Sequence, residues 1–178
     1  IHSLSDRPPV GSCLVVNDPT GLVEANLARR GSAVATWRRR RLPGMEASAW
    51  PQPGRYDLVT IRPPASRDEL TMPLHAAGAV LAPGGGVLVY GGNDEGIKSA
   101  ATPMEAIFGQ ARTLATRRHC RVIEATPGDV PLDLKSSLDD WILTVETTLD
   151  DGQARSGVSC PGLFAHGRLD EGTRLLLT

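Results

Sequence analysis

The segment CLVVNDPTGLVEANLARRGSAVATW, residues 13–37, determines the fold expected for this chain. It starts with a short apolar run over 13–17, which is followed by a cluster of turn residues. Apolar residues at helical spacing predict a helix over 22–30, and Gly31 is the residue type expected just past a helix C-terminus. A second strand is expected over 32–37. Strand, turn, helix and strand in this order form a βαβ unit, whose strands usually pair in parallel.

Strands and helices keep alternating beyond this unit. Further strands are expected over 56–61, 87–90, 113–116 and 121–125, and further helices over 66–80 and from Asn93 or Asp94 to about Phe108. Ser66 and Glu69 have the spacing of a capping box, and residues 81–86 have the proline and glycines of a tight turn. Elements of this length and order predict a doubly wound α/β sheet.

The composition changes after Thr126, so we expect two parts, 1–126 and 127–178. The expected elements of the second part are a linker over 127–138, strands over 141–147 and 154–159, and a hairpin turn at 150–152. The leucines at 175–177 form an apolar face with little chain left to cover it. Such a face is typical of an element that has been separated from its partner domain.

Composition places the chain among ordinary globular proteins. It has 178 residues, of which 40% are hydrophobic and 22% charged, and its formal net charge of -1 predicts no partner. No apolar stretch approaches the ~20 residues of a membrane span, and the N-terminus lacks a signal-peptide layout. We therefore expect a cytoplasmic protein with no membrane partner. Because the chain starts at Ile1 rather than methionine, we also expect a fragment or a trimmed chain.

The three cysteines predict no special chemistry. Cys13, Cys120 and Cys160 lie far apart without a CxxC pair, so neither a zinc site nor a disulfide framework is expected. Cys13 belongs to an apolar run and is expected to be a buried core thiol. Met72 and His75 lie on an expected helix, where we assign them to packing.

Arginine dominates the basic residues, since only Lys98 and Lys135 among the 19 are lysine. Genome base composition produces such a bias, but the planar guanidinium also suits the recognition of phosphates and bases. Two groups stand close together in the sequence: Arg38, Arg39, Arg40 and Arg41, and Arg117, Arg118 and Arg121 with His119. Each group is either a solvated surface or an RNA-binding patch that neutralises phosphates.

Four segments, in order along the chain, resemble segments of class I S-adenosylmethionine (SAM) methyltransferases. Residues 14–21 stand where that family has its glycine-rich first loop, 56–64 where a strand ends in (D/N)PP(Y/F), and 81–89 where L-x-P-G-G leads into a strand. The tail over 161–177 resembles the segment just upstream of the catalytic domain in two-domain rRNA guanine-N2 methyltransferases, the small-subunit MTS family. That segment reads roughly PGVFS…LD.GT.LLL.

In those enzymes the Rossmann-like domain is duplicated, with a degenerate N-terminal copy and a catalytic C-terminal copy. The resemblance implies that residues 1–126 form a degenerate, Rossmann-like methyltransferase domain with a doubly wound sheet. Residues 127–178 would then be the linker, a β-hairpin connector and the start of a catalytic methyltransferase domain. The chain ends where the second glycine-rich loop should begin.

The cofactor loop implied by the resemblance is degenerate. A SAM-binding loop needs closely spaced glycines, and the acidic end of the next strand binds the ribose hydroxyls. Here Asp18 and Gly21 are what remains of the loop, Pro19 stiffens it, and the next strand ends in Trp37 rather than in an acid. We therefore expect no cofactor on this chain, although the resemblance implies SAM for a parent enzyme.

The catalytic position is altered as well. In the family, the Asn or Asp of (D/N)PP(Y/F) accepts a hydrogen bond from the target amine, and the aromatic residue stacks on the base. Arg62 replaces the acceptor and cannot accept a hydrogen bond, Ala65 replaces the aromatic residue, and Pro63 and Pro64 remain. We therefore assign no catalytic residue to this chain.

Three residues of the tail have two interpretations. By the resemblance, Phe164, Asp170 and Thr173 border the SAM and base pocket of a downstream catalytic domain. Alternatively, they cap and pack the last helix, because Asp170 is a good N-cap three residues ahead of Thr173.

The sequence thus favours a non-catalytic N-terminal domain of an rRNA guanine-N2 methyltransferase, which supports the fold and the recognition of RNA. The implied partners are rRNA or a ribosomal subunit, and a catalytic methyltransferase domain. Two alternatives stay open. One is a free-standing small methyltransferase that still binds SAM, and the other is an adaptor that binds RNA or protein and buries its C-terminal leucines by dimerisation.

Overall fold

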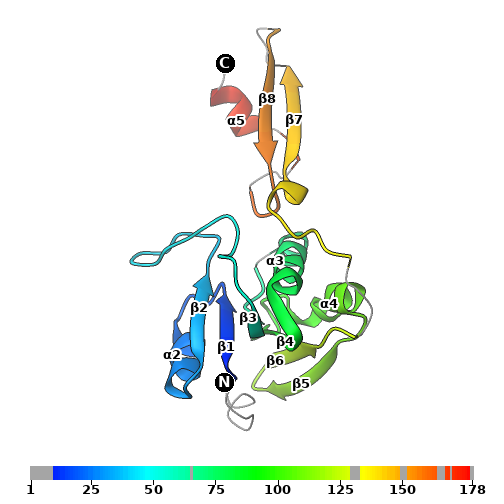
Figure 1. The fold of residues 1–178 in the computed structure, drawn as a ribbon. Coiled ribbons are helices and arrows are strands. Elements are labelled where there is room, and N and C mark those ends of the chain that lie inside the picture. Colours follow the sequence, from blue (N-terminus) through cyan, green and yellow to red (C-terminus); the bar gives the residue numbers. More distant parts are fainter. Residues whose placement is uncertain are drawn as a thin grey trace. The chain divides into compact units, whose positions relative to one another are not determined.

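The computed structural model describes residues 10–64, 66–128, 133–148, 152–163, 167–168 and 170–176. The chain divides into two units, Ile1–Ser136 and Ser137–Thr178. The first unit holds a six-stranded sheet and the second a two-stranded sheet (Figure 1).

The six-stranded sheet has the order β2-β1-β3-β4-β6-β5. Its strands are β1 (Ser12–Val16), β2 (Ala33–Trp37), β3 (Tyr56–Ile61), β4 (Leu81–Gly92), β5 (Arg112–Arg117) and β6 (Cys120–Ala125). The helices of this unit are α2 (Leu22–Arg29), α3 (Arg67–Val80), the 3-10 helix η1 (Ile97–Ser99) and α4 (Ala101–Phe108). Strands β2, β1, β3 and β4 pair in parallel, whereas β6 runs antiparallel to β4 and to β5. The expected α/β sheet is confirmed, as a mixed sheet.

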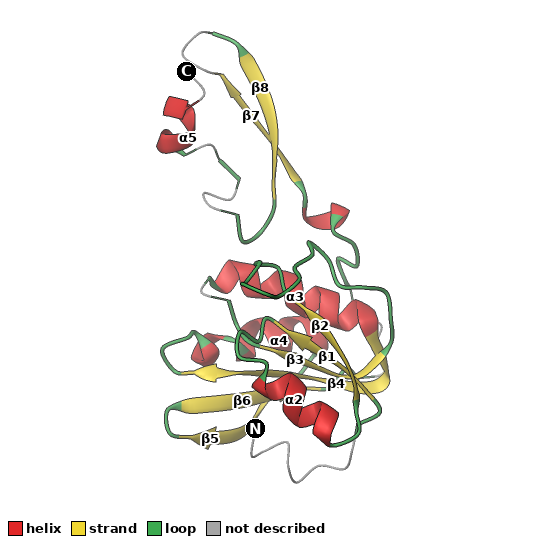
Figure 2. Ribbon diagram, turned by 90° about the vertical axis from the view of Figure 1, so that its left-hand side faces the viewer, coloured by secondary structure: helices red, strands yellow, loops and turns green. Residues whose placement is uncertain are grey.

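Helices cover both faces of this sheet (Figure 2), as the doubly wound prediction requires. Successive side chains of a strand point to opposite faces. On β1, Leu14 and Val16 belong to the core cluster that includes α3 and α4, whereas Cys13 and Val15 belong to the cluster that includes α2. All four are at most 2% exposed. Within the described part of the chain, no helix is both long and apolar enough to cross a membrane.

The order of the strands reverses between β1 and β3. Helix α2 connects β1 to β2 on one side, and the loop of residues 38–55 then leads to β3 on the other side of β1. The carboxyl ends of β1 and β3 therefore flank a crevice. This topological switch point is where open α/β sheets bind their ligands.

The tight turn expected over 81–86 is part of β4. The register with β3 passes from Tyr56–Leu81 directly to Leu58–Gly86, so the residues between Leu81 and Gly86 leave the ladder and the strand continues after them. Gly84 has a φ of 75° in this irregularity, a conformation that favours glycine. The turn predicted from the proline and glycines is present, but β4 begins before it, at Leu81, because Leu81 pairs with Tyr56.

Strands β5 and β6 form a hairpin whose two turn residues have positive φ, 47° at Arg118 and 64° at His119. Positive φ at both central residues is the mark of a type I′ turn, which matches the twist of the strands. The carbonyl oxygen of His119 accepts a hydrogen bond from the N–H of Asn93 at 2.7 Å. The hairpin turn is thereby bound to the segment that follows β4.

The helix expected from Asn93 or Asp94 begins later than that. The N–H of Asn93 is bonded to the hairpin, and the Glu95 carboxylate accepts the N–H of Gly92 at 2.7 Å, so this segment forms a turn. Gly96, with a φ of 83°, ends the turn, and η1 and α4 follow.

The second unit contains the 3-10 helix η2 (Asp139–Trp141), the antiparallel pair β7 (Leu143–Thr148) and β8 (Ala154–Ser159), and helix α5 (Glu171–Leu176). The hairpin prediction is confirmed, whereas the strand expected from Trp141 starts at Leu143. Trp141 is instead a buried residue of η2. The turn residues Asp150 and Asp151 lie outside the described residues.

Candidate functional site

A cavity of about 660 Å³ opens at the carboxyl edge of the six-stranded sheet, at the switch point. Its walls come from the loops after β1, β2, β3 and β4 and from the first turns of α3. The lining residues are Asn17, Pro19, Arg38, Arg40, Leu42, Arg62, Pro63, Pro64, Glu69, Asp94, Glu95 and Gly96. The cavity therefore gathers the degenerate loop, the arginine run and the altered catalytic position, which stand far apart in the sequence.

Asp18 occupies the N-terminus of α2 with its own side chain. One carboxylate oxygen accepts the N–H and the hydroxyl of Thr20 at 3.0 and 2.7 Å, and the other accepts the N–H of Val23 at 3.0 Å. Burial raises the pKa of Asp18, but these hydrogen bonds and the charge of Arg38 outweigh it and hold the pKa below its ordinary value. Gly21, with a φ of 67°, stands directly before the helix. The N–H of Val23 in the first turn of α2, and the positive end of this helix, thus already have an acceptor.

Trp37 ends β2 and organises the loop that follows. Its ring is 2% exposed and lies 6.0 Å from the ring of Trp50, at an interplanar angle of 57°. Its indole N–H donates to the carbonyl of Ser48 at 3.1 Å. An apolar ring that packs the loop therefore stands where a cofactor-binding strand would present a carboxylate.

The arginine run divides into buried and exposed members. Arg38 donates to the Asp18 carbonyl and pairs with Glu24 at 3.3 Å, and Arg39 pairs with Glu69 at 3.7 Å. Their side chains are 9% and 10% exposed. Arg40 also pairs with Glu69, at 3.3 Å, but its side chain is 70% exposed.

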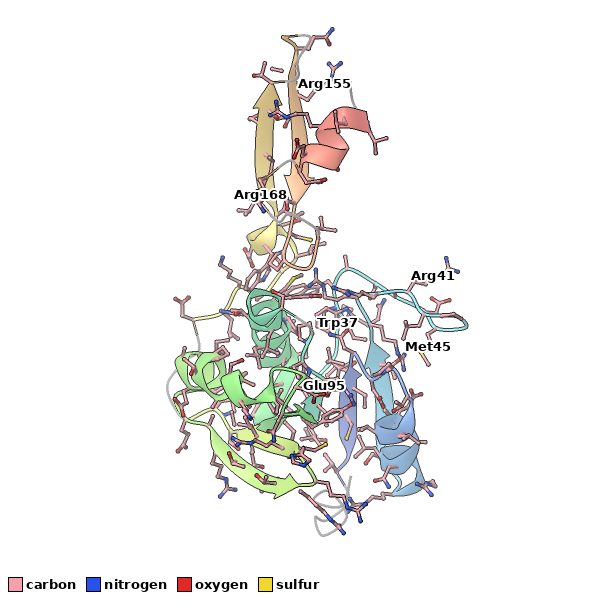
Figure 3. The ribbon with its side chains drawn as sticks, turned by 180° about the vertical axis from the view of Figure 1, so that it is seen from behind. Trp37, Arg41, Met45, Glu95, Arg155 and Arg168 are labelled. Carbon is pink, nitrogen blue, oxygen red and sulfur yellow. The ribbon has the colours of Figure 1, made fainter. Side chains whose placement is uncertain are left out.

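Arg41, the last member of the run, is exposed and points outward from the loop (Figure 3). Glu69 receives the charges of this run rather than acting in the expected capping box. Ser66 does hold the N-cap position of α3 with an extended backbone, but its hydroxyl makes no capping hydrogen bond.

Arg62 follows β3 at the altered catalytic position. Its backbone N–H donates to the carbonyl of Val16 at 3.0 Å, and its guanidinium forms an ion pair with Glu95 and lies 6.0 Å from the centre of the Tyr90 ring. Glu95 is labelled in Figure 3, and its second carboxylate oxygen accepts the N–H of Gly92. The position that accepts a hydrogen bond in amino-methylating relatives therefore carries a bound donor. Ala65 lies outside the described residues.

The second arginine group lies on the β5–β6 hairpin. Arg117, Arg118 and His119 are exposed, and Arg121 is partly buried. Within the described residues, none of the three arginines forms an ion pair. By contrast, Arg112 at the other end of β5 pairs with Glu124 at 2.7 Å.

In the second unit, Asp170 and Thr173 form the N-cap of α5. The Asp170 carboxylate accepts the N–H of Thr173 at 3.1 Å and its hydroxyl at 2.6 Å, and these bonds lower the pKa of Asp170. Both residues also line a cavity of about 230 Å³, together with Arg155 and Arg168 (Figure 3). Phe164 lies outside the described residues.

The other residues discussed in the sequence analysis lie away from the cavity lining and make packing or hydrogen-bond contacts. Cys13 is fully buried, and burial raises the pKa of its thiol. Met72 is buried in α3, and His75 accepts the N–H of Lys135 at 3.1 Å through Nδ1. Among the described residues, no group of three His, Cys, Asp or Glu side chains is placed to hold a metal ion.

Sequence reasoning missed the acidic half of the site. Glu24, Glu69 and Glu95 each hold an arginine of the cavity or its wall, yet nothing in the sequence pattern pairs them with Arg38, Arg40 or Arg62. The alternation of strands and helices was the available signal, because it brings the segments after parallel strands to one edge.

Comparison with known proteins agrees with this fold. The 16S rRNA N2 G1207 methyltransferase (RsmC) of T. Thermophilus, solved with AdoMet and guanosine, matches with a TM-score of 0.75 at 23% identity, over 98% of this chain and 49% of that chain. A putative methyltransferase from Pseudomonas syringae matches with a TM-score of 0.53 at 16% identity, over 70% of this chain and 94% of that chain. The sheet thus resembles the Rossmann-like methyltransferase fold.

Sequence relatives extend the comparison. The ribosomal RNA small subunit methyltransferase C of Pseudomonas entomophila is 37% identical over 122 residues, which are 68% of this chain and 35% of the relative. The protein of the same name from Hahella chejuensis is 27% identical over 179 residues, 94% of this chain and 52% of the relative. The chain therefore spans about a third to a half of the length of these relatives.

The family model described as "Methyltransferase small domain N-terminal" matches residues 11–144, which include the whole six-stranded sheet and the cavity at its edge. The resemblance seen in the sequence is confirmed, and the chain belongs to the family of N-terminal domains of small-domain methyltransferases.

Proposed function

We propose that this chain is a non-catalytic N-terminal domain of an rRNA guanine-N2 methyltransferase, in which it supports the fold and docks RNA. The relatives named above are rRNA methyltransferases, and the T. Thermophilus protein was solved with AdoMet and guanosine. The observation that carries the proposal is the carboxylate of Asp18, which accepts the N–H of Val23 at the start of α2. A cofactor at this loop would have to displace a buried, hydrogen-bonded charge.

Two further features support the absence of methyl transfer by this domain. Trp37 stands where a ribose-binding acid is needed, and Arg62 stands where the target amine needs an acceptor. At these three positions the chain's own side chains take the place of groups that would bind cofactor or substrate. SAM would bind to the catalytic domain of the parent enzyme and not to this chain.

Exposed arginines at the carboxyl edge are the proposed RNA contacts. Arg117 and Arg118 extend from the hairpin without an ion pair among the described residues, and Arg40 and Arg41 extend from the loop after β2. Arg121 adds a partly buried guanidinium beside the hairpin turn. Arg38 and Arg39 support this edge from within, because their charges are held by Glu24 and Glu69.

A catalytic methyltransferase domain is the second proposed partner. Leu175 and Leu176 of α5 are 70% and 87% exposed, and they form an apolar surface on a short helix. The greater length of the relatives supports a second domain as the element that covers it. Gel filtration of the 178-residue chain separates this proposal from a dimeric adaptor, because the adaptor requires a dimer and the proposal a monomer.

Calorimetric titration of SAM into the 178-residue chain tests the loss of cofactor binding. We expect no saturable heat at high micromolar SAM. Saturable binding would contradict the proposal and require an assay of the chain as an enzyme.

RNA docking is tested by fluorescence anisotropy with a labelled RNA at several salt concentrations. Arg118→Glu should weaken binding, and it should reduce the slope of log affinity against log salt by about 0.7–0.9 for each phosphate that the variant no longer neutralises. The control is Arg29→Glu, which makes the same charge change at the C-terminal end of α2, near the amino edge of the sheet. Equal affinities and slopes for the two variants would contradict the assignment of the hairpin.

A further inference from the structure

The cavity at the switch point has spare hydrogen-bond donors. A guanidinium carries five N–H groups. Among the described residues, Arg62 pairs with one carboxylate, that of Glu95, and Arg40 pairs with one carboxylate, that of Glu69. Both arginines line the cavity, and their side chains are 30% and 70% exposed. The unused donors of these two arginines therefore face a space that a ligand can enter.

Glu69 and Glu95 are more fully engaged than the arginines, whereas Asp94, the third acid that lines the cavity, is exposed. The two oxygens of Glu69 face Arg39 and Arg40, and the two oxygens of Glu95 face Arg62 and the N–H of Gly92. Arg40 and Arg62 together carry ten N–H donors, against the two carboxylate oxygens of Asp94, so the cavity still offers donors in excess of acceptors. A matching ligand accepts hydrogen bonds, as a phosphate does.

Another part of the cavity wall is apolar. Pro63 and Pro64 follow β3, Pro19 follows β1, and Leu42 extends from the loop after β2. A volume of about 660 Å³ lies within the range that small-molecule sites enclose. A nucleotide matches this lining, because its phosphate can accept hydrogen bonds from the arginines and its base can pack against the prolines and the leucine.

The cavity is continuous with the basic hairpin. The segment after β4 that supplies Asp94 and Glu95 to the cavity starts at Asn93, whose N–H binds His119 in the hairpin turn at 2.7 Å. Cys120 at the start of β6 pairs with Gly92 at the end of β4. Only β4 lies between β3 and β6, so these two strands are about 10 Å apart across the sheet.

We infer that this cavity takes one unpaired nucleotide of an RNA strand whose neighbouring phosphates lie on Arg117 and Arg118. The inference rests on the proposed RNA-docking function and adds the part of the RNA that is recognised. A base held in a duplex is stacked and paired, so it cannot enter a cavity of this kind. The domain should therefore prefer single-stranded to double-stranded RNA.

The preference is measured by anisotropy of the 178-residue chain with a labelled single-stranded decamer and with the same strand in a duplex. The double variant Arg62→Met with Glu95→Gln removes the donors and the matching charge together, so no buried charge is left unpaired. We expect it to lose about tenfold of the affinity for the single strand, as the loss of hydrogen bonds to a charged group predicts, and to keep its affinity for the duplex. Arg118→Glu should weaken both complexes.

A matched control replaces an ion pair outside the cavity. Arg112→Met with Glu124→Gln makes the same change on the β5–β6 pair, away from the carboxyl edge. We expect this variant to retain the single-strand preference. Circular dichroism and thermal melting establish that both double variants are folded before their affinities are compared.

Cross-linking with 4-thiouridine in the decamer locates the bound base. Cross-links within 38–42 or 62–64 are the expected result. Cross-links confined to the hairpin, together with an unchanged affinity of the cavity variant, would overturn the inference and leave RNA docking intact. If neither RNA binds, the proposed docking function fails as well. If free GMP binds but neither RNA does, the ligand of the cavity is a free nucleotide rather than an RNA strand.

Discussion

Replacing Asp18 by asparagine should destabilise the first unit by removing the acceptor for the N-terminus of α2. The asparagine oxygen can keep the two bonds from Thr20, but its amide NH₂ then faces the buried N–H of Val23, which loses its acceptor. A buried, unsatisfied N–H costs about 1–3 kcal/mol, and the attraction to Arg38 is lost with the charge. We expect the free energy of unfolding to fall by about 2 kcal/mol at neutral pH, which is a large part of the ~5–15 kcal/mol typical of a domain.

The effect should depend on pH in a defined direction. Burial raises the pKa of Asp18, but the bonds from Thr20 and Val23 and the charge of Arg38 hold it below the unfolded value. A carboxylate with a lowered folded pKa stabilises the protein fully above the unfolded pKa of ~3.9, and this contribution is lost as the pH falls through the folded pKa. The difference between the native chain and Asp18→Asn should therefore shrink below about pH 4.

Urea unfolding followed by circular dichroism, at neutral pH and at several acidic pH values, measures the loss of unfolding free energy and its dependence on pH. The control is Asp94→Asn, an exposed acid of the same cavity, whose effect should stay within about 0.5 kcal/mol. An effect of Asp18→Asn no larger than that of the control, or one that is independent of pH, would refute the assignment of Asp18 as the acceptor for α2.

Three further predictions concern the core and the edge. Trp37→Ala should cost about 3–5 kcal/mol in urea unfolding, since the ring is 2% exposed, and should make the loop of residues 38–55 sensitive to protease. Glu69→Ala should cost about 3 kcal/mol, because it leaves the nearly buried guanidinium of Arg39 without its carboxylate, whereas Glu69→Gln should cost less. Because Cys13 is buried and its pKa is raised, a thiol reagent should label exposed Cys120 in the folded chain and Cys13 only after unfolding; rapid labelling of Cys13 would contradict its place in the core.

The strands and helices could be predicted because their signals are short-range. The apolar run at 13–17, the helical spacing after it and Gly31 lie within about twenty residues and specify one βαβ unit. The start of β4 was missed for the opposite reason. Leu81 belongs to the sheet through its pairing with Tyr56, and the pairing resumes at Gly86, after the proline and glycines that local sequence alone identifies as a turn.

The site could be predicted in position but not in its internal chemistry. Segments that follow parallel strands meet at one edge, so the alternation of strands and helices brings the loop after β1 and the prolines after β3 together. The acidic partners of the cavity's arginines lie far along the chain. Glu24 is 14 residues from Arg38, and Glu95 is 33 residues from Arg62. At such separations the spacing in the sequence carries no information about contacts. A run of four arginines therefore suggested one exposed patch, whereas two of its members are internal partners.

At this edge of the sheet, side chains of the chain itself occupy positions that a cofactor occupies in ligand-binding folds of this kind. The switch point of an open α/β sheet presents helix N–H groups and strand ends that need partners, and in ligand-binding relatives of such folds a cofactor supplies them. Here Asp18 supplies the acceptor for α2, Trp37 packs the loop after β2, and Glu95 joins the ends of β3 and β4 through Arg62 and Gly92. The strand ends and the helix are thus satisfied from within, while Arg40 and Arg62 keep donors for the cavity beyond them. The donors that remain are the ones that the proposed RNA contacts would use.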